Sequence, residues 1–135
     1  MSLWKDNYAL GVDQLDSQHR QLLGATEDLL RAAAQEGQQQ CTQCKQAVAF
    51  LKDYTVVHFQ AEEQYMAQTG YPGLEAHRAL HREFAENLRQ TELELMRQDY
   101  RGEAVGKLAR DMTRWWMFHI MREDKKIVAA REDGT

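Results

Sequence analysis

The stretch HFQAEE, residues 58–63, falls within a segment that has the apolar spacing of an amphipathic helix. A histidine and a carboxylate interrupt the apolar face of that helix. Residues four apart lie about 40° apart around a helix, so their side chains can contact the same bound group, and we pair His58 with Glu62. Glu63 is turned away from this face, and we expect it to be a solvated charge. The stretch therefore predicts a helix that buries a polar pair against other helices.

Helices are predicted for most of the remaining chain as well. The sequence contains one proline, and its eight glycines fall mostly between periodic segments. We predict four helices, with an N-terminal arm at residues 1–15 and a frayed tail at residues 131–135: residues 16–35, 42–68, 74–97 and 103–130. Asp16 or Ser17 is the expected cap of the first helix, and EGQQQ after it is the expected polar linker. Because short connections favour antiparallel neighbours, the predicted fold class is all-α, an up-down-up-down four-helix bundle formed by one domain, residues 1–135.

Periodicity assigns an aromatic residue to the inward face of two of the predicted helices. Phe50 falls on the inward face of the second helix, and Trp115 falls on that of the fourth. Trp116 is predicted to lie outside this face, where it is a candidate for a helix–helix or dimer contact. We expect a monomer or a weak homo-oligomer.

The composition argues against several classes of partner. The formal net charge is -4, with 17 Lys and Arg against 21 Asp and Glu, so neither nucleic acid nor an anionic membrane surface is an expected partner. No apolar run is long enough for membrane insertion and the N-terminus does not resemble an export signal, so we expect a cytoplasmic protein. Cys41 and Cys44 are too few for a disulfide framework. They lie near the predicted start of the second helix, where a lowered thiol pKa would permit a redox switch, although two inert thiols are the favoured interpretation.

All five histidines fall on or beside the predicted inward faces: His19, His58, His77, His81 and His119. Burying an unpaired polar group costs roughly 2 kcal/mol or more, against a total stability of roughly 5–15 kcal/mol. The five positions map to one end of an up-down-up-down bundle, and bundles build metal sites from inward side chains of facing helices. The sequence therefore predicts a metal cluster at this end.

Spacing also selects the other chelating residues. His77 and His81 lie four apart and form a second pair. In the fourth helix, Glu123 lies four residues after His119, whereas Asp124 lies five after it and about 140° away on a regular helix. Regular geometry favours Glu123, but a π-type turn would bring Asp124 to the same face instead. The spacing alone leaves this choice open.

Four stretches resemble the hemerythrins, and within them the single-domain bacterial form: GVDQLDSQH, HFQAEE, YPGLEAHRALH and WWMFHIMREDKK. They cover nearly the whole chain in the family's order, and as a set they are highly specific. The resemblance implies a non-haem di-iron centre bridged by an oxo or hydroxo group, and it selects Asp124 over Glu123. The implied protein ligands are His19 and His58 on one iron, His77, His81 and His119 on the other, and Glu62 and Asp124 as bridges to both.

This number of ligands suits dioxygen binding. Two octahedral irons offer roughly twelve positions, and five imidazoles, two bridging carboxylates and a solvent-derived bridge fill all but roughly one. The resemblance places the vacancy on the iron held by His19 and His58. Ferritin-like oxidases use Glu-x-x-His pairs, and none occurs in this chain. A structural zinc ion takes four ligands and would leave roughly three of the buried groups unexplained.

Reversible binding also requires a dry pocket beside the vacancy. The residues predicted to line it are close to the ligands in sequence, although core packing explains each one taken singly: Leu22, Phe59, Trp115, Met117 and Ile120. A thioether near bound oxygen can be oxidised, so Met117 leads us to expect measurable autoxidation. Metal-bound imidazoles need acceptors for their outer N–H groups, and Asp16 and Gln18 are candidates.

The predicted function is reversible dioxygen binding for storage, transport or delivery to an oxygen-consuming enzyme, without enzymatic activity of its own. A sensor of oxygen, nitric oxide or redox state is one alternative, although sensors of this family usually carry further domains. A di-iron reductase or oxidase is another alternative. The sequence offers no dedicated acid, base or electron-transfer motif for such an enzyme.

Overall fold

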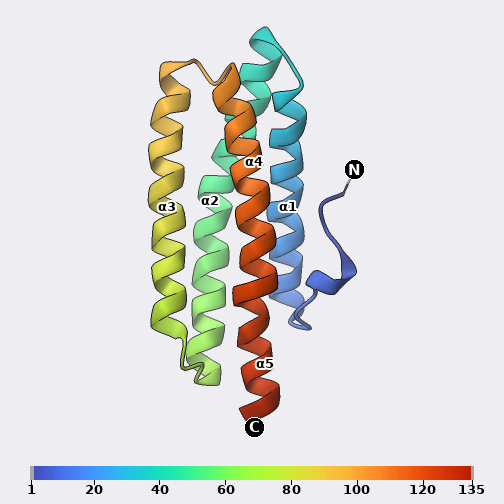
Figure 1. The fold of residues 1–135 in the computed structure, drawn as a ribbon, viewed down its shortest axis with the longest axis vertical. Coiled ribbons are helices and arrows are strands. Elements are labelled where there is room, and N and C mark those ends of the chain that lie inside the picture. Colours follow the sequence, from blue (N-terminus) through green and yellow to red (C-terminus); the bar gives the residue numbers. More distant parts are fainter. Residues whose placement is uncertain (1, 135) are drawn as a thin grey trace.

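The computed structural model describes residues 2–134, and the side chains among them as far as residue 130. Four long helical rods pack side by side with neighbouring rods antiparallel (Figure 1), which confirms the predicted all-α four-helix bundle. The elements are a short 3-10 helix at Asp6–Tyr8, α1 at Asp13–Ala33, α2 at Gly37–Thr69, α3 at Leu74–Arg97, α4 at Glu103–Phe118, a π-helical segment η2 at His119–Asp124 and α5 at Lys125–Gly134. The last three follow one another without a break and form the fourth rod.

The first helix begins earlier than predicted. α1 starts at Asp13, and its first turn has no side-chain cap, so neither Asp16 nor Ser17 serves as one. Asp16 is buried instead, and its carboxylate accepts hydrogen bonds from the backbone N–H groups of Leu10 (2.8 Å) and Gly11 (3.1 Å). It therefore ties down the N-terminal arm and is not the acceptor for a histidine that the sequence suggested.

The second helix also begins earlier than predicted, and the expected polar linker is its first turn. Glutamine is a good helix former, and the buried Gln40 side chain holds three elements together. Its Nε2 atom donates to the carbonyl oxygen of Ala32 (3.2 Å), and its Oε1 atom accepts from the backbone N–H of Gly102 (2.9 Å). The connection between α1 and α2 is therefore short. Gln40 fixes the start of α2 to the end of α1 and to the residue before α4.

The two cysteines lie inside α2, beyond its first turn, and both are buried. Burial, together with the neighbouring Cys41 thiol, raises the pKa of Cys44 to about 11. This direction is opposite to the lowered thiol pKa that a redox switch would need. The structure therefore favours the interpretation as two inert thiols.

The buried face of α2 differs from the predicted one at Phe50. This face centres on Val48 and Leu51, which are fully buried, whereas the Phe50 side chain is 39% exposed. Phe50 stacks on Tyr54 with 5.0 Å between ring centroids. The two rings cover each other at the edge of the core.

The C-terminal end of the fourth rod is longer than predicted. α5 continues to Gly134, past the expected helix end at residue 130. The predicted fraying of residues 131–135 remains a prediction, because Thr135 and the side chains of 131–134 lie outside the described residues. Among the described residues, no helix has an apolar stretch long enough to cross a lipid bilayer.

Candidate metal centre

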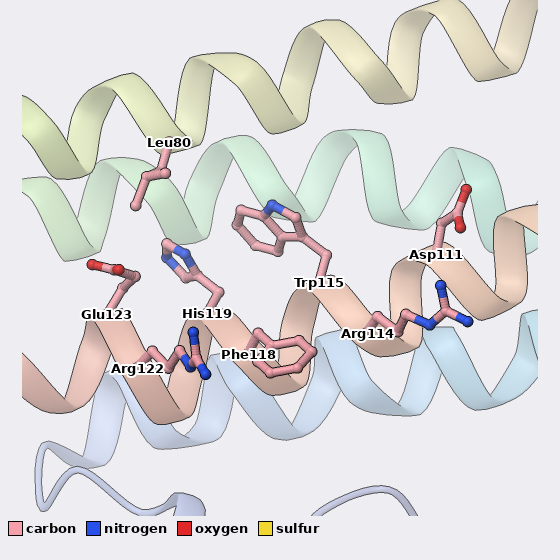
Figure 2. Close-up of a pocket in the computed structure, with 8 residues that line it drawn as sticks. All are labelled: Leu80, Asp111, Arg114, Trp115, Phe118, His119, Arg122 and Glu123. Atoms are coloured by element: carbon pink, nitrogen blue, oxygen red, sulfur yellow. The ribbon is translucent and has the colours of Figure 1, made fainter.

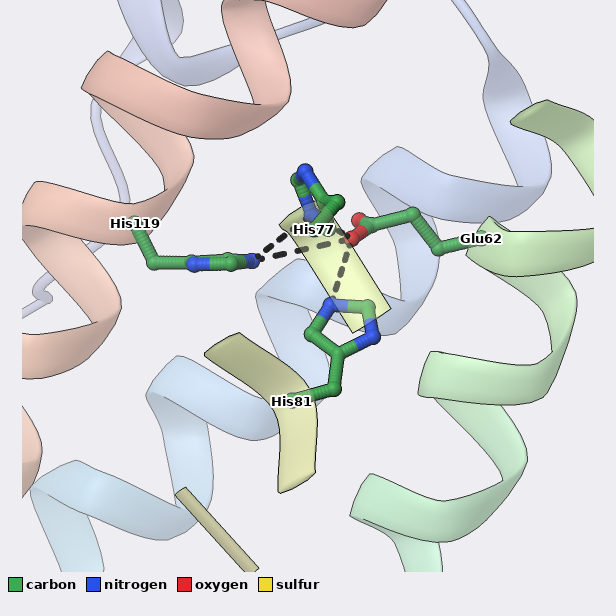
Figure 3. A group of neighbouring side chains, drawn as sticks. All are labelled: Glu62, His77, His81 and His119. Atoms are coloured by element: carbon green, nitrogen blue, oxygen red, sulfur yellow. Dashed lines mark hydrogen bonds and ion pairs between the residues drawn. The ribbon is translucent and has the colours of Figure 1, made fainter. Parts of the chain in front are cut away.

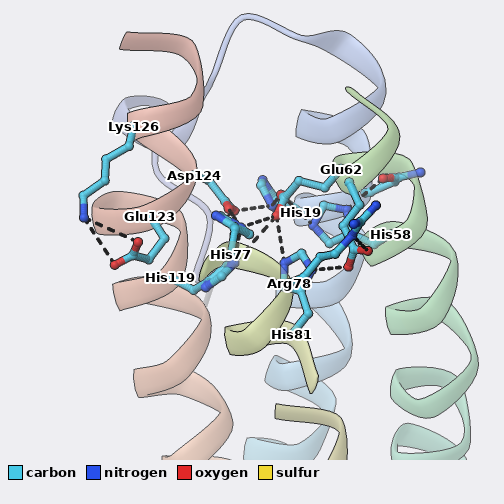
Figure 4. Close-up of polar contacts among 12 residues, drawn as sticks. His19, His58, Glu62, His77, Arg78, His81, His119, Glu123, Asp124 and Lys126 are labelled. Carbon is cyan, nitrogen blue, oxygen red and sulfur yellow. Dashed lines mark hydrogen bonds and ion pairs between the residues drawn. The ribbon is translucent and has the colours of Figure 1, made fainter. Parts of the chain in front are cut away.

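One end of the bundle gathers seven polar side chains from all four rods (Figure 4). Each of α1, α2, α3 and η2 contributes at least one histidine, and α2 and η2 each add a carboxylate. The seven side chains are no more than 4% exposed: His19, His58, Glu62, His77, His81, His119 and Asp124. The structure thus brings together every residue that the sequence placed in the cluster.

Glu62 lies between two groups of imidazoles. Its Oε1 atom is 2.8 Å from Nε2 of His77 and 3.0 Å from Nε2 of His81 (Figure 3). Its Oε2 atom is 3.3 Å from Nε2 of His58 and 3.6 Å from Nε2 of His19. The two oxygens of one carboxylate therefore face different groups of histidines.

Asp124 divides its oxygens in the same way. Its Oδ1 atom is 3.0 Å from Nε2 of His77 and 3.1 Å from Nε2 of His119, and its Oδ2 atom is 3.0 Å from Nε2 of His19. Two carboxylates that each point one oxygen toward each side have the geometry of bridging ligands.

The cluster therefore contains two candidate cation sites, which we name by their imidazoles. The two-histidine group consists of His19 and His58, and the three-histidine group consists of His77, His81 and His119. On each side, the ligand atoms, including an oxygen of Glu62, lie within 4.8 Å of one another, and Asp124 completes the two-histidine side.

Asp124 reaches the cluster because the helix is locally underwound. Residues His119–Asp124 form a π-helical turn, and such a turn brings residues five apart onto the same face. Asp124 is fully buried, whereas Glu123 points outward and contacts Lys126 (3.4 Å between Glu123 Oε2 and Lys126 Nζ). The structure thus places Asp124, not Glu123, in the cluster.

The two carboxylates favour the protonated forms of His19 and His77 when no cation is bound. Burial alone would lower the pKa of His19, but the nearby carboxylates of Asp124 and Glu62 outweigh it and raise this pKa to about 9. The same balance raises the pKa of His77 to about 9. Burial acts to raise the pKa of Glu62, but the surrounding imidazoles hold it well below its usual value. Cations could therefore replace these protons.

Several side-chain nitrogen and oxygen atoms in the cluster have no hydrogen-bond partner among the described residues: both ring nitrogens of His19, Nε2 of His58, Oε2 of Glu62 and both side-chain oxygens of Asp124. Leaving such atoms unpaired costs about 1–3 kcal/mol each. Apart from Nδ1 of His19, each of these atoms lies at ion-pair distance from another atom of the cluster without the angles of a hydrogen bond, as expected when lone pairs converge on a cation. Imidazole nitrogens and carboxylate oxygens suit a transition metal such as iron. The residues present therefore fit a pair of metal ions.

Two residues outside the cluster accept the outer N–H groups of its imidazoles. The Nδ1 atom of His58 lies 2.8 Å from Oε1 of Gln18, which confirms Gln18 as an acceptor. The Nδ1 atom of His81 lies 2.8 Å from Oε2 of Glu63, and the other carboxylate oxygen of Glu63, Oε1, contacts Nε of Arg78. The prediction that Glu63 is a solvated charge is therefore wrong. Periodicity within α2 gives no sign of this contact, because both partners of Glu63 lie on α3.

A family model described as a hemerythrin HHE cation binding domain matches residues 10–130. The chain belongs to the hemerythrin family. Among its relatives is a bacteriohemerythrin of Stenotrophomonas maltophilia, 29% identical over 94% of this chain and 78% of the relative. A bacteriohemerythrin of Clostridium acetobutylicum is 25% identical over 95% of this chain and 99% of that protein. A myohemerythrin of Riftia pachyptila is 31% identical over 64% of this chain and 65% of that protein. Membership of the hemerythrins and the buried cluster together indicate a non-haem di-iron site.

Aromatic rings cover two imidazoles of the three-histidine group in this hemerythrin. Phe59 stacks on His81, with 3.7 Å between centroids and 4° between planes. Trp115 stacks on His119, with 4.2 Å and 12°. Of the other residues predicted to line an oxygen pocket, Leu22 and Ile120 are fully buried, and Met117 is half-buried against the core. All five therefore belong to the apolar packing of the molecule.

The two adjacent tryptophans have the opposite arrangement from the prediction. Trp116 is fully buried, whereas Trp115 is only partly buried. The reason is that α4 packs more closely on α1 than on α3. Trp115 lies in the looser seam between α3 and α4, against Phe84 (4.3 Å between centroids), and Trp116 fills the centre. The expectation that Trp116 forms an outer contact is therefore wrong.

A surface cavity of about 380 Å³ lies in this seam (Figure 2). Trp115 and His119 form part of its wall, together with the exposed ring of Phe118. Glu123 also lines this cavity. Trp115 thus covers one face of an imidazole of the three-histidine group beside this cavity.

Proposed function

We propose that this hemerythrin holds two iron ions and binds dioxygen reversibly, for storage, transport or delivery to an oxygen-consuming enzyme. The observation that carries the proposal is the division of both carboxylates, Glu62 and Asp124, between the two groups of imidazoles. A mononuclear site would not need two carboxylates that each face two ways. When bound, the iron pair would supply the electrons that reversible dioxygen binding requires.

The proposed ligand assignment follows the two groups. His19 and His58 would hold one iron, His77, His81 and His119 would hold the other, and Glu62 and Asp124 would bridge them, with an oxo or hydroxo group as the third bridge. The two-histidine side has fewer protein ligands, so the open position would lie there. The buried carboxylates also offset part of the positive charge of the two cations.

The surrounding residues support binding without turnover. Gln18 and Glu63 accept the outer N–H groups of His58 and His81, which fixes the orientation of both rings. Leu22 and Ile120 are fully buried and apolar, so they keep water away from the cluster. We propose that they line the oxygen pocket together with Phe59, Trp115 and Met117.

The test is a series of oxygenation cycles. The iron-loaded protein is reduced without air, exposed to air and returned to vacuum, while its visible spectrum is recorded. Reversible carriage requires a charge-transfer band that appears with air and disappears under vacuum over several cycles. A band that bleaches irreversibly in the first cycle, or continued consumption of oxygen and reductant over many turnovers, would favour an enzyme over a carrier.

The half-buried Met117 gives this proposal a second consequence. A thioether close to the pocket can be oxidised, so we expect measurable autoxidation of the oxygenated protein and slower autoxidation after Met117→Leu. Loss of the charge-transfer band in air measures the rate. An oxygenated form that stays stable for days at room temperature would contradict this expectation.

A further inference from the structure

Trp116 carries a buried hydrogen-bond donor that the protein does not satisfy. Its side chain is fully buried, and its Nε1 atom has no hydrogen-bond partner among the described residues. Tryptophan usually finds a partner for this N–H when it is buried, and leaving it unpaired costs about 1–3 kcal/mol. Phe59 and Phe84, whose ring centroids lie 5.9 and 5.5 Å away, offer no conventional acceptor.

The ring that carries this donor lies against both histidines of the two-histidine group, and its centroid is 6.5 Å from that of His119 in the other group. The ring centroid of Trp116 is 5.9 Å from that of His58 and 6.3 Å from that of His19. The Nε2 atoms of these two histidines are also without hydrogen-bond partners. An unpaired donor and unpaired metal-binding nitrogens therefore share one buried region, as expected if something other than the protein completes them.

The two-histidine side is also where the proposed di-iron centre would have its open position. We propose that the indole N–H of Trp116 donates a hydrogen bond to the ligand held at this position. This inference rests on the proposed function. It makes Trp116 a residue that determines ligand specificity: it would favour small ligands whose outer atom is negatively charged or accepts hydrogen bonds. Dioxygen that has gained electrons and the azide anion both belong to this class.

Azide is the probe for the test, and the protein is used iron-loaded and oxidised. Azide affinity is measured by titration of the visible spectrum for the wild-type protein and for Trp116→Phe, which keeps an aromatic ring but lacks the N–H. We expect Trp116→Phe to weaken azide binding about tenfold, the loss typical of one hydrogen bond to a charged group. Trp4→Phe is the matched control, because Trp4 lies in the N-terminal arm against Arg20, and its azide affinity should equal that of the wild type.

A vibrational measurement separates a hydrogen bond from a change of packing. The stretching frequency of bound azide is compared in ordinary and heavy water, after exchange of the indole proton. We expect an isotope shift in the wild-type protein and in Trp4→Phe, and its loss in Trp116→Phe. If Trp116→Phe does not take up iron, the shift in the wild-type protein still decides, because an unshifted band would overturn the proposal.

The outcomes also separate this inference from the proposed function. A wild-type protein that does not take up two iron ions would contradict the proposed function. The other outcome concerns only Trp116. If the wild-type protein and Trp116→Phe both take up two irons and bind azide with the same affinity and the same isotope shift, the proposed role of Trp116 is overturned and the proposed function is not.

Discussion

At the scale of single residues, the cluster could be predicted from spacing, but its supporting contacts could not. The pairs His58 with Glu62 and His77 with His81 follow from helical periodicity, and all four are buried together. Glu63 lies on a different face of the same helix and acts through a contact with α3. Such contacts depend on how two helices are rotated against each other, and the pattern within one helix does not contain that information.

Glu63 provides the prediction at this scale. Glu63→Gln replaces a charged acceptor of the His81 Nδ1–H by a neutral one. Loss of such a partner typically lowers metal affinity by about 10- to 100-fold, so iron should pass faster to a competing chelator. Glu75→Gln is the control, because Glu75 is exposed and its ion pair among the described residues is with Arg78. Equal rates of iron loss in the two variants would show that Glu63 does not support the site.

At the scale of elements, the fourth rod departs furthest from regular geometry. A regular helix would present Glu123 to the cluster, and only the π turn presents Asp124. The resemblance to the hemerythrins selects Asp124, whereas periodicity does not, because periodicity assumes a constant rise and turn. Periodicity also failed to predict that Trp116, and not Trp115, fills the core.

The π turn leads to a paired prediction. Asp124→Asn removes a charge that contacts imidazoles on both sides of the cluster, so the variant should hold fewer than two irons per chain. Glu123→Gln alters a carboxylate that contacts Lys126 at the surface and should retain both. Metal analysis of the two purified variants makes the comparison. The reverse result would mean that Glu123 is the ligand.

The N-terminal arm is the second element with a measurable role. Asp16 accepts two backbone N–H groups of the arm, and Lys125, directly after the π turn, donates to the carbonyl oxygen of Ala9 (2.8 Å). Removing the acceptor leaves the buried N–H of Leu10 unpaired, so Asp16→Ala should lower the free energy of unfolding by about 1–3 kcal/mol. The exposed Asp13 offers a control, and Asp13→Ala should change it by less than about 0.5 kcal/mol. Urea unfolding that gives equal midpoints would contradict this role of the arm.

At the scale of the whole molecule, charge in the core should make the metal-free protein sensitive to alkali. The pKa values of His19 and His77 are raised from 6.5 to about 9, so the folded state binds these protons more tightly than the unfolded state. Their contribution to stability is therefore complete below about pH 6.5 and is lost as the pH rises through about 9. The urea midpoint of the metal-free protein should fall over this range, whereas a midpoint that rises or stays constant would contradict the coupling.

The architecture of the molecule was the most predictable feature, because a single proline and continuous apolar periodicity leave few alternatives to a helical bundle. Antiparallel neighbours then bring the early part of α1, the late part of α2, the early part of α3 and η2 to one end. Every residue of the cluster follows from this topology, apart from the choice between Glu123 and Asp124. The bundle thus acts as a frame that fixes two carboxylates between five imidazoles.

The central claim is that these seven side chains hold a pair of iron ions. The most direct test is an anaerobic titration of metal-free protein with ferrous iron, followed by metal analysis after removal of unbound ions. Saturation at two irons per chain is the expected result, with Asp124→Asn falling below this value. Saturation of the wild-type protein at one iron per chain, or failure to retain iron, would contradict the claim.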